Sequence, residues 1–145
     1  MENKEKEIEK EIEEYLKSFQ KEKEKEISIQ KLFKIIKQFP LNETIQQISF
    51  MIFKEKLDKF LKINDLENLK EQIIQIENEI ETIITIMNIF PNNEVIQFIG
   101  CEILGILSVE NERIETIIKS MNNFPNNQDI QFIGCASLAN ISFRK

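Results

Sequence analysis

Apolar residues recur at helical spacing in the second half of the chain. Between residues 94 and 108, Ile96, Ile99 and Ile103 lie three or four positions apart, which places them on one face of an α-helix. The same rhythm returns between residues 129 and 142. Each stretch therefore predicts a helix with one buried face. Three glycines and three prolines in the whole chain favour long helices over a fold of many short strands.

This pattern belongs to an internal repeat with an offset of 34 residues (124 − 90 = 34). Nineteen of the 29 positions in 80–108 are identical to their counterparts in 114–142. The segment Phe-Pro-Asn-Asn at 90–93, for example, returns at 124–127. Chance does not produce such a match, so the two stretches are copies of one structural unit.

A more divergent copy lies 51 residues upstream of the first (90 − 39 = 51). Phe-Pro-Leu-Asn-Glu at 39–43 aligns with Phe-Pro-Asn-Asn-Glu at 90–94, and Ser49 aligns with Gly100, so that this position stays small. About three stacked units are the minimum that buries a common core. The predicted repeat domain covers 27–145, with units at about 27–61, 62–108 and 109–145.

Each unit is expected to form two helices separated by the Phe-Pro pair. Proline disfavours helix in the residue before it, so the first helix should end near Phe39, Phe90 and Phe124. An asparagine after the proline can cap the second helix by accepting its free N–H groups. In the longer spacer of the middle unit, Asn64 or Asp65 is expected to cap an additional helix.

Residues 1–26 consist mostly of glutamate and lysine and predict a charged amphipathic helix. Its apolar stripe is Ile8, Ile12, Leu16 and Phe19, with Tyr15 beside it. The favoured interpretation is a capping helix that covers the first repeat. The alternative is a coiled-coil strand, although the stripe lasts only about two heptads.

Composition and charge argue against several classes of binding partner. The chain is 41% hydrophobic and 30% charged, which is a foldable balance, and its net charge of −6 argues against nucleic acid and anionic membranes as partners. No apolar run approaches the ~20 residues of a membrane helix, and no secretory signal is visible. We therefore expect a protein of the cytoplasm or nucleus.

Candidate chemistry is sparse. The chain has no histidine for acid–base work, no glycine-rich phosphate loop and too few nitrogen or sulfur ligands for zinc. We therefore expect neither enzyme activity nor a cofactor or metal. Cys101 and Cys135 occupy equivalent repeat positions and are interpreted as small packing residues. Gly100 and Gly134 predict a close approach between helices.

The last copy of the repeat resembles a known family. Residues 130–142 (Ile-Gln-Phe-Ile-Gly-Cys-Ala-Ser-Leu-Ala-Asn-Ile-Ser) resemble the third helix of an armadillo repeat, 114–123 its second helix and 124–127 the connecting turn. The resemblance covers 80–143 well and 27–145 loosely. It implies an all-α, armadillo-like α-solenoid, a right-handed superhelix of about three short repeats with an N-terminal capping helix.

The sequence departs from the armadillo pattern at several positions, and these departures limit which of the family's functional residues this chain is expected to share. Only residues 109–112 remain of the family's first helix between the two best copies, and tryptophan is absent from the chain. Asn140 stands where the family has its groove asparagine, whereas the equivalent position in the preceding repeat is Ile106. An importin-like grip on basic peptides, which uses ladders of Trp and Asn, is therefore not expected.

The resemblance places a partner-binding groove along the last helix of each repeat. If Asn140 faces that groove, so do Phe132 and Ala136, four residues apart each. The predicted groove residues are Gln47, Met51, Phe98, Glu102, Ile106, Phe132, Ala136 and Asn140. Two alternatives remain: Phe98 and Phe132 are core residues, and Asn140 is a surface residue or bonds neighbouring backbone.

The expected function is a scaffold or adaptor that binds a partner protein or an extended peptide along this groove. One alternative is a structural module that self-associates through an uncapped C-terminal repeat, or a fragment of a longer armadillo array. A second is a tetratricopeptide-like binder, because that repeat also has a 34-residue period, although its Trp, Gly, Tyr and Ala markers do not align here.

Overall fold

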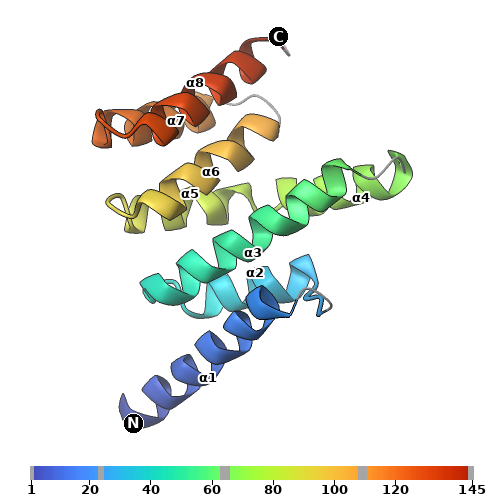
Figure 1. The fold of residues 1–145 in the computed structure, drawn as a ribbon, viewed down its shortest axis with the longest axis vertical. Coiled ribbons are helices and arrows are strands. Elements are labelled where there is room, and N and C mark those ends of the chain that lie inside the picture. The colour runs from blue at the N-terminus through green and yellow to red at the C-terminus, as the bar shows by residue number, and fades with distance from the viewer. Residues whose placement is uncertain (1, 23–24, 63–65, 108–110, 144–145) are drawn as a thin grey trace. The chain divides into compact units, whose positions relative to one another are not determined.

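The protein is all-helical in the part of the chain that its computed structural model describes, residues 2–22, 25–62, 66–107 and 111–143. No strand occurs within these ranges, so the predicted all-α class is confirmed. Figure 1 shows the helices in chain order. They are α1 (Glu2–Lys21), α2 (Ile29–Gln38), α3 (Glu43–Leu61), α4 (Leu66–Glu77), α5 (Ile80–Ile89), α6 (Glu94–Ile106), α7 (Asn111–Asn123) and α8 (Gln128–Phe143).

These helices form two compact units, residues 1–64 and 65–145. The first unit holds α1, α2 and α3, and the second holds α4 to α8. The expected cap of α4 at Asn64 or Asp65 lies outside the described residues. Within the described part of the chain, no helix combines the length and the apolar character that a membrane span requires.

In the first unit, α2 and α3 form a hairpin. Ser28 caps α2 by accepting a hydrogen bond from the Lys31 N–H at 3.1 Å. The hairpin buries Phe33 of α2 against Phe53 of α3, with the rings edge to face and their centroids 5.3 Å apart. Such a pair adds about 0.5–1.5 kcal/mol beyond the area it buries.

The N-terminal helix packs against α3 of the same unit. Leu16 is fully buried, whereas Ile8, near the start of the apolar stripe, is 47% exposed. The side-chain amide of Asn42, in the turn before α3, also donates to the Glu9 carboxylate at 2.6 Å. The centre of the stripe is therefore used within the first unit, as expected of a capping helix. The prediction that the helix continues to residue 26 is wrong, because α1 ends at Lys21 and residues 25 and 26 are not helical.

The Phe-Pro turn has the same structure in all three repeats. The first helix of each hairpin ends at the residue before the phenylalanine, at Gln38, Ile89 and Asn123, as predicted. The asparagine two residues after the proline then caps the second helix. The side-chain oxygens of Asn42, Asn93 and Asn127 accept from the N–H groups of Ile45 (2.9 Å), Ile96 (3.0 Å) and Ile130 (3.0 Å).

A glutamine in the second helix ties each hairpin together. Proline has no N–H, so the carbonyl four residues before it lacks its helical donor. In the middle repeat this is the carbonyl of Met87, four residues before Pro91, and the side-chain amide of Gln97 donates to it at 2.9 Å. The same amide donates to the Phe90 carbonyl at 3.1 Å. The glutamine thus supplies the hydrogen bond that the proline removes.

The other two repeats have the same arrangement. Gln46 donates to the carbonyls of Ile36 (3.1 Å) and Phe39 (2.8 Å), and Ile36 lies four residues before Pro40. Gln131 donates to the carbonyls of Met121 (2.7 Å) and Phe124 (3.0 Å), and Met121 lies four residues before Pro125. We call this set of contacts the glutamine clamp. It makes the Phe-Pro turn and the glutamine a single unit of structure.

In the second unit the hairpin α7–α8 packs on α6. The Ser137 hydroxyl of α8 donates to the Cys101 carbonyl of α6 at 2.9 Å, and the Asn123 amide donates to the Pro91 carbonyl at 2.8 Å. Ser120 of α7 donates to the side-chain oxygen of Gln97. The clamp glutamine of one repeat therefore also receives a hydrogen bond from the next repeat.

Glycines permit two kinds of close approach in this unit. A Cβ at Gly100 would lie 2.8 Å from the Cγ of Met87, and one at Gly134 would meet Met121, so both glycines make room for a methionine of their own hairpin. The predicted reason for these two glycines is confirmed. A third glycine, Gly105, makes room for the next repeat, because a Cβ there would lie 2.7 Å from the Cα of Ser137.

We predict that Gln97→Ala lowers the free energy of unfolding by about 1–3 kcal/mol, because it leaves a buried carbonyl without a donor. Gln97→Glu, which keeps the shape and Oε1 but has no N–H to donate, should cost at least as much at neutral pH. Urea unfolding followed by circular dichroism measures both.

Gln128→Ala is the matched control, because Gln128 is exposed in the first turn of α8. It should change the free energy of unfolding by less than about 0.5 kcal/mol. Equal stability of the Gln97 and Gln128 variants would contradict a structural role for the clamp.

Candidate protein-binding surface

Six of the eight predicted groove residues lie on two neighbouring helices of the second unit. Helices α6 and α8 are in contact, and each carries its three residues at a spacing of four, which keeps them on one side of the helix. None of the six is buried. We call them the α6–α8 row: Phe98, Glu102 and Ile106 on α6, and Phe132, Ala136 and Asn140 on α8.

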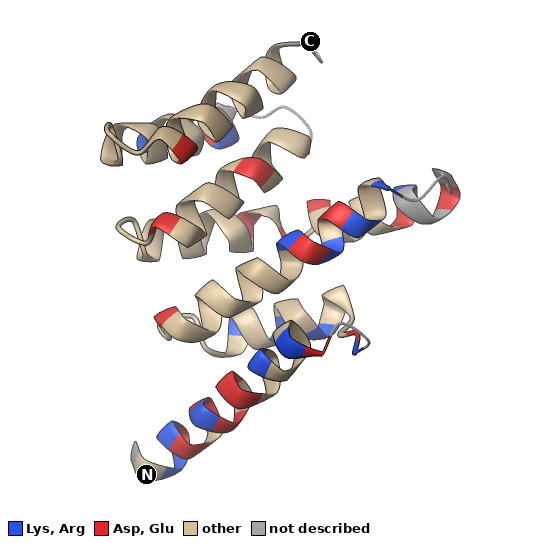
Figure 2. Cartoon of the chain, viewed as in Figure 1, with Lys and Arg blue, Asp and Glu red and all other residues tan. Residues whose placement is uncertain are grey.

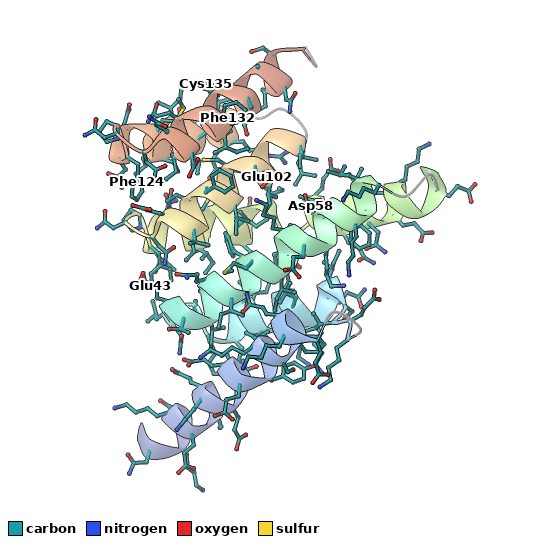
Figure 3. The ribbon with its side chains drawn as sticks, in the orientation of Figure 1. Glu43, Asp58, Glu102, Phe124, Phe132 and Cys135 are labelled. Carbon is teal, nitrogen blue, oxygen red and sulfur yellow. The ribbon has the colours of Figure 1, made fainter. Side chains whose placement is uncertain are left out.

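Phe132 is the most informative member of the row. Its side chain is 73% exposed, so the alternative that it is a core residue is wrong. Phe98, at the same position in the preceding repeat, is half-buried. The difference follows from packing, because α8 lies against α6. Figure 3 labels Phe132 on α8 and Glu102 on α6.

The remaining row residues are exposed or half-buried. Asn140 is exposed, and Glu102, Ile106 and Ala136 are half-buried. Asn140 therefore has one of the surface positions expected for it, on the same side of α8 as Phe132. A large exposed aromatic residue is a feature found at protein-binding surfaces.

The other two predicted residues, Gln47 and Met51, lie on α3 in the first unit. Gln47 is half-buried and Met51 is 38% exposed. The amide of Gln20 approaches the Met51 sulfur at 3.6 Å, so α1 borders this position. The structure thus places six of the predicted residues on two adjoining helices of the second unit and these two within the first.

Charge is scarce around the row. Figure 2 shows acidic and basic residues concentrated along α1, with few on α6 and α8. Glu102 is the only charged member of the row, and Asp129 is the only charged residue between Gln128 and Phe143. The row is therefore suited to a partner that offers apolar and hydrogen-bonding groups rather than a strongly basic or acidic one.

The two cysteines have opposite environments, although the sequence gives them the same repeat position. Cys101 is fully buried, and burial raises the pKa of its thiol to about 11, with a smaller opposing effect from the Ser120 hydrogen bond. Cys135 is exposed, so its interpretation as a packing residue is wrong. The hairpin α7–α8 covers Cys101, because Ser120 of α7 hydrogen-bonds its thiol and Ser137 of α8 donates to its carbonyl. Cys135 lies on the side of α8 away from α6 (Figure 3).

No group of three or more potential metal ligands that could hold an ion occurs among the described residues. The structure does identify residues whose role the sequence reasoning missed. The clamp glutamines Gln46, Gln97 and Gln131 were visible as a repeated Ile-Gln pair, but their function depends on the carbonyl that each proline leaves without a donor. Gly105 and Ser137 were missed because neither is repeated.

Comparisons with known proteins give no further assignment: no family model, curated protein or solved structure matches this chain. The features that bear on function are therefore the exposure and the low charge of the α6–α8 row.

We predict that a maleimide modifies Cys135 and spares Cys101 in the folded chain at neutral pH. Burial and a pKa about two units above the ordinary value lower the thiolate fraction of Cys101 roughly a hundredfold, so it should react only through unfolding. Peptide mass spectrometry over a time course measures both rates.

Cys135→Ser is the control and should abolish the fast reaction, whereas Cys101→Ser should retain it. Equal modification rates at the two cysteines would contradict the difference in burial.

Proposed function

We propose that this chain is a non-catalytic helical repeat protein of armadillo-like architecture, and that it binds a partner protein or an extended peptide along the α6–α8 row. The main observation that supports this proposal is the exposure of Phe132. An aromatic side chain that is 73% exposed contributes nothing to a core, but it can contribute strongly once a partner buries it.

The geometry of the row supports an elongated ligand. Helices α6 and α8 pack against each other, and each carries its row residues four positions apart on one side. Phe98 and Phe132 offer apolar contacts, and the Asn140 amide can both donate to and accept from a peptide backbone. An extended peptide presents apolar side chains and free backbone groups at regular intervals, which is what such a row can engage.

The regular hairpins support the repeat architecture. Each repeat has the same asparagine cap and the same glutamine clamp, so the second helix of every hairpin starts with the same geometry relative to the first. Equivalent residues then recur at equivalent positions on α6 and α8.

The test is capture from a lysate of the source cell with immobilised chain, followed by titration of the purified captured protein against variants. Phe132→Glu and Asn140→Arg alter exposed row residues and should each weaken binding roughly tenfold or more, which corresponds to about 1.4 kcal/mol. Their helicity and unfolding free energy should match those of the unmodified chain, because neither side chain is buried.

Ile74→Glu is the matched control, because Ile74 is an apolar residue of α4 that is 58% exposed and lies outside the row. It should leave the affinity unchanged. Binding that survives both row changes, or that Ile74→Glu weakens equally, would contradict the proposed surface.

A further inference from the structure

We draw no further inference here: the strongest candidate, the exposed apolar face that Ile118 of α7 and Cys135 and Ala139 of α8 form on the outer side of the hairpin α7–α8, is an unpartnered helix face, and nothing in the structure shows what covers it.

Discussion

The architecture depends on a backbone carbonyl that proline leaves without a donor. In each repeat the proline ends the first helix, and the carbonyl four residues earlier would be an unsatisfied buried group without another N–H. The side-chain amides of Gln46, Gln97 and Gln131 provide that N–H and also bind the carbonyl of the phenylalanine before the proline. Because one amide reaches both groups, the turn and the start of the second helix are held in one geometry.

The glutamine clamp explains why each repeat presents the same surfaces for packing and for binding. A hairpin with a fixed turn presents the same faces each time, so the packing face of α6 reappears on α8. In the interior, the clamp glutamine Gln97 also accepts from Ser120 of the following repeat, which links local hairpin structure to stacking. Residues away from the packing faces form the α6–α8 row. The proposed partner-binding surface is thus a consequence of the repeated hairpin.

Much of the fold could be predicted from the sequence, because periodicity and turn chemistry are local. The helix breaks at Phe39, Phe90 and Phe124 and the asparagine caps follow from proline sterics and from the free N–H groups of a helix start. The burial of Cys101 and the exposure of Cys135 could not be predicted, because the two residues occupy the same repeat position. Their environments differ only in which helices pack over them. For the same reason the sequence alone does not decide whether Phe132 is a surface residue or a core residue. The clamp needed the three-dimensional hairpin, since glutamine and carbonyl are ten residues apart.

The most direct test of this account is hydrogen exchange of the glutamine side-chain amides, observed by NMR in the folded chain. The account predicts that Gln46, Gln97 and Gln131 have slowly exchanging side-chain N–H groups, because each donates to two carbonyls of its own hairpin. The exposed residues Gln30, Gln38 and Gln128 should exchange at the rate of free glutamine. Equal exchange rates for the two groups would contradict the claim that the glutamine clamp holds each hairpin.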